Sequence, residues 1–269
     1  MIQPILHAMY KLSFTSSEKK LPVVVLLHGF CESKKIWDHF IPVLADIAHL
    51  VVPDLPGFGE NKALEEPVTI EKMADEVYRL LLDLQLDEGG ILVGHSLGGY
   101  VSLAFAEQCP HWVKGLCLFH STALPDTEEK KKNRNKTIKF LEQNGVPAFT
   151  ENFIPSLFYE KNRKSLQPAI KKAIQIANQT PASTAIEVTK ALRDRKDRTH
   201  VLKNASYPFM FIAGKEDQAV PFDTLKDQFW LPKGPVTLQV FPETAHMGMF
   251  EREKETLEGL KGFIRSVYK

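Results

Sequence analysis

A glycine-rich turn between an apolar run and a helical pattern is the feature that most constrains the fold of this chain. Residues 90–93 read Gly-Ile-Leu-Val, which is typical of a buried strand, and residues 100–108 follow with helical spacing. The turn between them, Gly94-His-Ser-Leu-Gly-Gly99, has the pattern G-x-S-x-G. Such a turn is so tight that only glycine fits on either side of Ser96, whose backbone is forced toward a strained conformation. A serine with a purely structural or phosphate-binding role is the alternative for this segment.

Short apolar runs alternate with longer helical patterns along most of the chain. This alternation predicts an α/β fold with a mostly parallel, doubly wound sheet. The clearest helix is expected from Ile70 to Leu84, with Thr69 as its N-cap and Glu71 in its first turn, and a last helix is expected at about 251–268. The expected strands are residues 23–27, 49–53, 90–94, 115–119, 208–213 and 236–241.

The alternation is interrupted between residues 121 and 204, where helical patterns occur without a strand-like run. Thr180-Pro181 predicts a helix start there, with Thr180 as N-cap and Pro181 at the first helical position. We interpret an all-helical insertion between two strands as a cap over the carboxyl edge of the sheet, where ligands bind in such folds. The expected domains are therefore a core of residues 1–120 and 205–269 and a helical cap of residues 121–204.

Two residues downstream of Ser96 are candidates for activating its hydroxyl. A serine is a poor nucleophile unless a histidine accepts its proton, and a carboxylate orients that histidine. Asp217 follows the fifth expected strand and His246 follows the sixth. The predicted catalytic set is therefore Ser96 as nucleophile, His246 as general base and Asp217 as orienting acid. Asp54, which ends an earlier strand, is the second candidate for the acid.

Backbone groups and the cap complete the predicted site. His28-Gly29-Phe30 follows the first expected strand, and we assign the oxyanion-binding N–H groups to Phe30 and to Leu97, the residue after the nucleophile. His28 itself is expected to brace its loop rather than transfer protons. Three side chains are expected to contact substrate: His120, which ends a strand beneath the cap, and Phe153 and Phe158 of the cap.

Charge and cysteine content argue against several other classes of protein. A formal net charge of +1 gives no electrostatic reason to expect nucleic acid or an anionic membrane as a partner. The basic cluster at residues 130–136 follows acidic residues, and we interpret it as a solvated helix face. The three cysteines lack zinc-ligand and CxxC spacing, so no metal site is expected. No segment approaches the ~18 apolar residues of a transmembrane helix, which favours a cytoplasmic protein, and the oligomeric state is left open.

Several motifs, taken as a set, resemble the α/β-hydrolase superfamily over nearly the whole chain. They are His28-Gly29-Phe30, Asp54-Leu-Pro-Gly-Phe-Gly59, the turn at Ser96, Gly214 to Pro221, and Ala245-His246. The chain is most similar to the branch of capped esterases, enol-lactonases and carbon–carbon hydrolases, and residues 191–198 resemble a stretch common in that branch. Ala245 departs from the glycine that relatives often carry before the histidine.

The resemblance implies an esterase that acts on a small-molecule substrate through an acyl-enzyme and without a cofactor. We expect a carboxylic ester of a small or medium acyl group. Hydrolysis of a lactone or of a carbon–carbon bond on the same triad is the enzymatic alternative, and a ligand-sensing module with little turnover is the non-enzymatic one. A serine at position 96 argues against dehalogenases and epoxide hydrolases, which resemble this fold but use aspartate.

Overall fold

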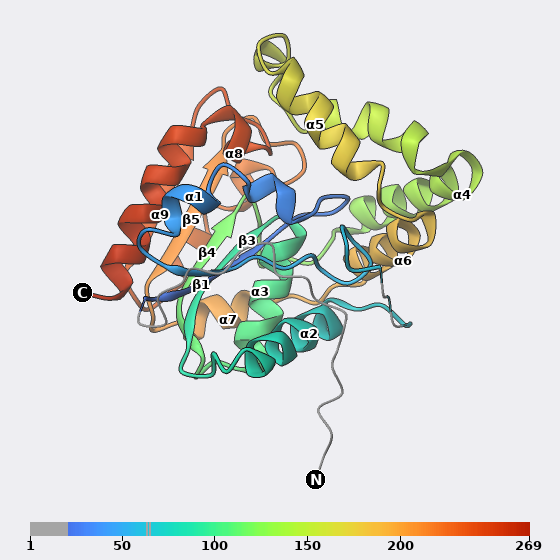
Figure 1. The fold of residues 1–269 in the computed structure, drawn as a ribbon. Coiled ribbons are helices and arrows are strands. Elements are labelled where there is room, and N and C mark those ends of the chain that lie inside the picture. The colour runs from blue at the N-terminus through green and yellow to red at the C-terminus, as the bar shows by residue number, and fades with distance from the viewer. Residues whose placement is uncertain (1–20, 63, 65) are drawn as a thin grey trace.

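A six-stranded parallel sheet forms the centre of the molecule (Figure 1). The computed structural model describes residues 21–62, 64 and 66–269, so the first 20 residues of the predicted core domain lie outside the described part. The strand order is β2-β1-β3-β4-β5-β6. The strands are β1 (Val23–Leu27), β2 (His49–Val51), β3 (Gly90–His95), β4 (Val113–Phe119), β5 (Phe209–Gly214) and β6 (Val236–Phe241).

The strand order reverses direction between β1 and β3. From β1 the chain moves outward to β2, and from β3 it moves to the other side through β4, β5 and β6. Ligands of open parallel sheets bind at the carboxyl ends of the strands at such a switch point. Phe30 and Ser96 follow these two strands by a few residues, so both lie at the switch point. β3 is buried along its whole length, as its uninterrupted apolar sequence predicts.

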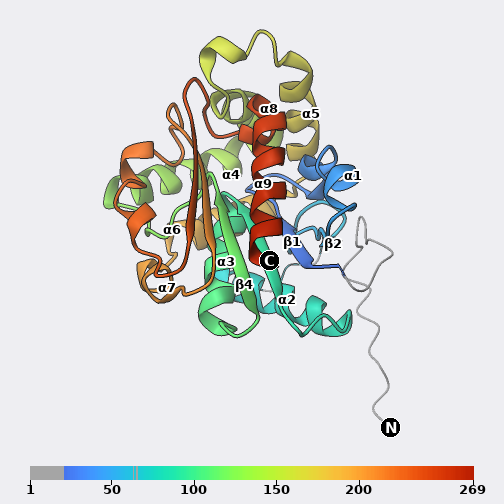
Figure 2. The same ribbon diagram turned by 90° about the vertical axis from the view of Figure 1, so that its left-hand side faces the viewer.

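Helices cover both faces of the sheet, with α2, α3 and α7 along one face and α1 and α9 along the other (Figures 1 and 2). The predicted N-cap of α2 is confirmed, because the Thr69 side chain accepts a hydrogen bond from Lys72 N–H at 3.1 Å. The core helices are α1 (Ile41–Leu44), α2 (Ile70–Asp83), α3 (Leu97–Gln108), α8 (Gly248–Glu251) and α9 (Glu253–Val267). The predicted doubly wound α/β class is therefore confirmed.

Four helices connect β4 to β5, and three of them gather at one end of the molecule (Figure 1). They are α4 (Glu128–Ser156), α5 (Gln167–Ala177), α6 (Ala182–Arg193) and α7 (Thr199–Asn204). α4 turns at Gly145, whose φ of 75° and ψ of 174° are not helical, so it consists of two helical pieces. α7 packs against α3 of the core, although it falls within the range predicted for the cap. Pro181 is the N-cap of α6 rather than its first helical residue, a shift of one position.

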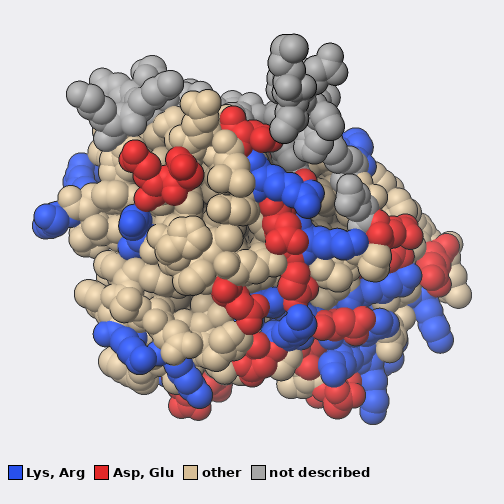
Figure 3. Space-filling model, turned by 90° about the horizontal axis from the view of Figure 1, so that it is seen from below, with Lys and Arg blue, Asp and Glu red and all other residues tan. Residues whose placement is uncertain are grey.

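The surface of the described residues carries charges of both signs close together. On the face seen from below in Figure 3, basic and acidic side chains are interspersed, as the small net charge suggests.

Short 3-10 helices occur at Lys34–Trp37, Glu160–Asn162, Phe222–Thr224 and Gln228–Trp230. Among the helices described, none combines the length and the apolar character needed to cross a membrane.

Candidate active site

Ser96 lies in the turn between β3 and α3 with a strained backbone. Its φ of 49° and ψ of −111° fall outside the regions that a serine ordinarily adopts. The turn is held by close packing: a Cβ on Gly94 would overlap the Gly98 carbonyl, and one on Gly98 would overlap the Leu27 carbonyl of β1. Ser96 N–H donates to the Phe119 carbonyl at 3.0 Å, and its hydroxyl makes no capping bond to α3. The side chain is therefore left available at the helix N-terminus.

Asp217 and His246 meet at the carboxyl ends of β5 and β6. His246 Nδ1 lies 2.7 Å from Asp217 Oδ2, and both residues are 3% exposed. The other carboxylate oxygen, Oδ1, accepts N–H bonds from Ala219 at 2.9 Å and Val220 at 2.8 Å. Burial raises the pKa of Asp217, but the charge of His246 and hydrogen bonds from neighbouring histidines outweigh it and hold the pKa well below its usual range. Asp217 is therefore an ionised carboxylate that orients the imidazole through its Nδ1.

Asp54, the second candidate for the acid, binds other groups. Its two oxygens accept backbone N–H bonds from Lys34 at 2.8 Å and Glu60 at 2.9 Å. Its carboxylate also packs so closely against Gly59 that a Cβ there would overlap it. Asp54 thus stabilises the loop after β2, while Asp217 is the carboxylate that lies at hydrogen-bond distance from His246.

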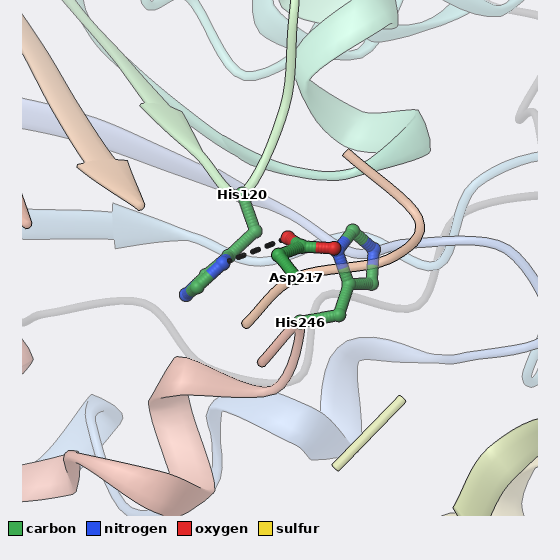
Figure 4. A group of neighbouring side chains, drawn as sticks. All are labelled: His120, Asp217 and His246. Atoms are coloured by element: carbon green, nitrogen blue, oxygen red, sulfur yellow. Dashed lines mark hydrogen bonds and ion pairs between the residues drawn. The ribbon is translucent and has the colours of Figure 1, made fainter. Parts of the chain in front are cut away.

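His120 is a second histidine on the same carboxylate (Figure 4). Its Nδ1 lies 3.1 Å from Asp217 Oδ2, the oxygen that also binds His246. Burial lowers the pKa of His120 to about 4, so the ring is neutral near pH 7 and its Nδ1–H donates. The three side chains offer ligand atoms within 4.8 Å of one another, as a metal site would, but two N–H···O bonds account for this arrangement.

The expectation that His120 contacts substrate is corrected by its position. The side chain is fully buried, and it lies behind Asp217 rather than among the residues that line the cavity at Ser96. Its Nε2 has no hydrogen-bond partner among the described residues and faces Gly248, where a Cβ would overlap it. Its position at a strand end correctly predicted that His120 lies near the site. It did not predict that the ring faces away from the cavity.

The two predicted oxyanion donors lie on adjacent elements. Leu97 is the first residue of α3, and an N–H at that helical position has no partner within the helix. Phe30 lines the cavity, and its loop is braced by His28, whose Nδ1 lies 2.8 Å from the Gly29 carbonyl. His28 Nε2 accepts Leu55 N–H at 2.9 Å, so its ring is used for structure, in agreement with its predicted role.

A buried ion pair behind the turn at Ser96 was missed from the sequence. His95 Nδ1 lies 2.9 Å from Glu32 Oε2, and His95 Nε2 lies 3.1 Å from the His246 carbonyl. Burial lowers the pKa of His95, but Glu32 outweighs it and raises the pKa above its ordinary value. Glu32 Oε2 also accepts Gly29 N–H at 2.5 Å. Glu32 and His95 therefore connect the Phe30 loop, the Ser96 turn and the His246 loop. The only sequence signal was an acidic residue two positions after Phe30.

A cavity of about 270 Å³ opens at Ser96 between the sheet and the inserted helices. Phe153 of α4 lines it, as expected, and its ring stacks on Phe149 with centroids 4.7 Å apart. Phe158, also expected there, is instead 1% exposed and packs on Phe250 outside the cavity lining. The basic cluster is not wholly solvated either, because Lys130 and Arg134 face the cavity. The lining consists of Phe30, Glu32, Ser96, Tyr100, Lys130, Asn133, Arg134, Thr137, Phe153, Leu157, Leu192, Gln218, Ala219, Val220 and His246.

Several known proteins are similar to this chain in sequence or in structure. The chain is 27% identical over 252 residues to Methylesterase 1 of Arabidopsis thaliana, covering 87% of this chain and 93% of that protein. A malate-bound thermophilic esterase from Thermogutta terrifontis superposes with a TM-score of 0.86 at 27% identity, covering 97% of this chain and 93% of that one. An enol-lactonase from Burkholderia xenovorans has the same TM-score at 17% identity, covering 95% of each chain, which shows a shared fold.

The family assignment rests on most of the chain. The model of the alpha/beta hydrolase fold family matches residues 22–253, a range that includes β1, the Ser96 turn, the inserted helices and the His246 loop. The parallel sheet and its flanking helices agree with that match. This protein therefore belongs to the α/β-hydrolase family.

Proposed function

We propose that this protein is a serine hydrolase that cleaves carboxylic esters of small or medium acyl groups through an acyl-enzyme. The observation that carries the proposal is the placement of Ser96 and His246 on one cavity, with His246 Nδ1 bound to Asp217 at 2.7 Å. Because Nδ1 is occupied by the carboxylate, Nε2 is the nitrogen left to accept the serine proton. The esterase and methylesterase relatives support ester substrates.

The reaction follows from these roles. Ser96 Oγ attacks the ester carbonyl while His246 accepts its proton, and Asp217 stabilises the imidazolium that forms. Phe30 N–H and Leu97 N–H bind the oxyanion, and each such donor is worth about 3–4 kcal/mol in the transition state. His246 then protonates the leaving alcohol, and water repeats the sequence to release the acid. A lactone is a cyclic ester, so the same groups would open one by the same steps.

We also propose that α4, α5 and α6, which lie within the range 121–204 predicted for the cap, act as a cap that selects substrate. α4 and its C-cap residue Leu157 supply much of the cavity wall opposite the sheet, and Phe153 of α4 is part of it. The cap is tied to the catalytic loop, because His246 N–H donates to the Leu157 carbonyl at 2.9 Å. Movement of α4 would therefore shift the loop that carries the proposed general base, His246.

Ser96→Ala tests the proposal directly. Loss of a triad nucleophile lowers kcat by about a million-fold, while folding should be unchanged because the hydroxyl is not used in capping. Turnover of a p-nitrophenyl ester series measures the loss and also separates an enzyme from a ligand sensor. A fluorophosphonate should label the wild type on Ser96, as peptide mass spectrometry would show. Label on another residue, or an unlabelled protein without turnover, would contradict the assignment.

A further inference from the structure

Two cations line the same cavity as Ser96 and His246. Lys130 and Arg134 lie one turn apart near the start of α4, which places both side chains on one face of the helix. The helix begins at Glu128, so Lys130 lies in its first turn and Arg134 in its second. Both cations belong to the basic cluster at residues 130–136, which the sequence alone predicts to be a solvated helix face.

Lys130 is half-buried, and no carboxylate among the described residues pairs with its ammonium group. Lys130 Nζ donates to the Ala219 carbonyl at 3.0 Å, and this is its only hydrogen bond within the part of the chain that is described. Burial lowers the pKa of Lys130, and neighbouring Arg195 and Arg134 lower it further, while the carboxylates of Asp126 and Asp217 oppose this without outweighing it. A partly desolvated cation without a counter-ion costs free energy that a bound anion would recover.

Arg134 also has donors to spare. Its Nε donates to Asp126 Oδ2 at 3.0 Å, while Arg195 Nη1 takes Asp126 Oδ1 at 2.6 Å. Arg134 and Arg195 thus share the single carboxylate of Asp126, one on each oxygen. The two terminal nitrogens of Arg134 have no hydrogen-bond partner among the described residues, and a guanidinium can bind a carboxylate through two parallel bonds.

Negative charge on the cavity wall does not cancel the positive charge of Lys130 and Arg134. Glu32 is the one carboxylate among the described residues that line the cavity, and it already accepts bonds from His95 and from Gly29 N–H. Burial raises the pKa of Glu32, but the charge of His95 outweighs it, so the two form an internally neutral pair. The field in the cavity is therefore positive toward α4.

We propose that Lys130, Arg134, Asn133, Thr137 and Gln218 form an anion subsite, which binds a carboxylate carried by the substrate whose ester is cleaved at Ser96. All five line the cavity, and the last three add amide or hydroxyl donors. The inference rests on the proposed esterase function and makes it narrower: the substrates are half-esters of dicarboxylic acids or esters with an equivalent acidic group. A cavity of about 270 Å³ is large enough for the ester and the carboxylate of one small molecule.

Kinetics with matched esters test the anion subsite. Methyl pentanoate and monomethyl glutarate have the same acyl carbon chain, ending in a methyl group or a carboxylate, and monomethyl succinate and adipate vary the spacing. We expect kcat/KM for at least one half-ester to exceed that of the neutral ester by about tenfold or more, because hydrogen bonds to charged groups are worth 10–100-fold. Lys130→Gln should lower this preference by a similar factor, and Lys130→Arg should preserve it. Lys132→Gln, an exposed position on the same helix, is the matched control.

A binding measurement separates failure of the subsite from failure of the esterase proposal. Ser96→Ala can hold monomethyl glutarate without cleaving it, so calorimetric titration reports affinity alone. We expect binding that weakens about tenfold or more when Lys130→Gln is added, with thermal unfolding confirming that each variant is folded. Equal kcat/KM for neutral and acidic esters in the wild type, or equal affinity with and without Lys130→Gln, would overturn the subsite. Binding of the half-ester without any ester turnover in the wild type would retain the subsite and reject the esterase.

Discussion

Asp217 accepts four hydrogen bonds, two of them from histidines, and this distinguishes it from Asp54, the other candidate for the acid. Two come from the Ala219 and Val220 N–H groups to Oδ1, and two come from His120 and His246 to Oδ2. The backbone bonds fix the rotation of the carboxylate, so the oxygen that meets His246 is held in one place. Four donors also keep the group ionised.

Asp217→Asn should lower kcat by about ten-thousand-fold, because an amide in this position favours the wrong tautomer of the histidine. Asp54→Asn should cost far less activity per folded molecule, since Asp54 binds the backbone of Lys34 and Glu60. Active-site titration followed by kcat measurement on both variants gives the ranking. If Asp54→Asn proved the more damaging, the acid would have to be assigned to the loop after β2.

His120→Phe should lower kcat by about tenfold to a hundredfold, with little change in KM. The variant removes one charge-assisted hydrogen bond from Asp217, and such a bond contributes about 1.5–3 kcal/mol. KM should change little because the ring lies outside the cavity lining. Steady-state kinetics on a p-nitrophenyl ester separate the two parameters, and a large rise in KM at constant kcat would return His120 to the substrate-binding role first expected of it.

At the scale of elements, α4 brings two proposed functions together, one on each side of its turn at Gly145. Its first turns bring Lys130 and Arg134 to the cavity, and its last part brings Phe153. The ring of Phe30 packs edge-on against Phe149 and Phe153, with centroids 6.3 Å and 6.2 Å apart, so the oxyanion loop rests on the inserted helix. The proposed selection of substrate and the proposed oxyanion donors are therefore physically connected.

Phe153→Ala and Phe158→Ala form a pair that separates selection from packing. Phe153→Ala should shift the acyl-chain preference, because a pocket contact discriminates by about 1–3 kcal/mol per methylene-sized difference. Phe158→Ala should instead destabilise the fold by about 3–5 kcal/mol with little change in chain preference, since its ring is buried on Phe250. Measurements of kcat/KM along a p-nitrophenyl series and of chemical unfolding distinguish the two. A uniform loss along the series for Phe153→Ala would remove this residue from the selective wall.

At the scale of the whole molecule, buried histidines couple stability to pH. Burial lowers the pKa of His120 to about 4, whereas an unfolded chain gives a histidine its ordinary value of 6.5. The unfolded state therefore binds a proton more readily between these values. This contribution to stability is present above pH 6.5 and is lost as the pH falls toward 4.

His120→Phe should therefore flatten the pH dependence of stability between pH 6.5 and 4. The unfolding free energy at pH 6.5 minus that at pH 4 should be smaller in the variant by about 3 kcal/mol. The reason is that one pKa unit corresponds to about 1.4 kcal/mol. Urea denaturation at closely spaced pH values measures it, and the subtraction between variant and wild type removes the shared contributions of other groups. An unchanged slope would show that His120 takes up its proton in the folded state.

Residues 195–198 illustrate how far whole-molecule packing depends on partners distant in the sequence. Arg195 binds the buried Asp126, and its guanidinium lies 4.3 Å from the ring centroid of Tyr100. Arg198 reaches Glu71 of α2 at 2.7 Å and Glu107 of α3 at 3.1 Å. The sequence marked this stretch only through its resemblance to relatives, and the structure supplies the reason: it fastens the inserted helices to the core.

The sequence by itself determined the elements and their order, because these depend on local patterns. Apolar runs gave all six strands within a few residues, Thr69 gave the start of α2, and glycine spacing gave the turn at Ser96. Chain order also placed Ser96, Asp217 and His246 after successive strands, and parallel pairing brings such positions to one edge.

Only the tertiary structure decided which side chains face one another. Helical periodicity alone could not tell that Lys130 and Arg134 face the cavity, because the opposite wall comes from residues almost 90 positions downstream. His120 and Phe158 turned away from the cavity for the same kind of reason, because their partners come from later parts of the chain. Asp217 lies in the loop after β5, and Phe250 lies in α8. Glu32 and His95 pair across 63 residues. Charge and aromatic character are local properties of a sequence, whereas burial and pairing depend on what long-range folding places opposite them.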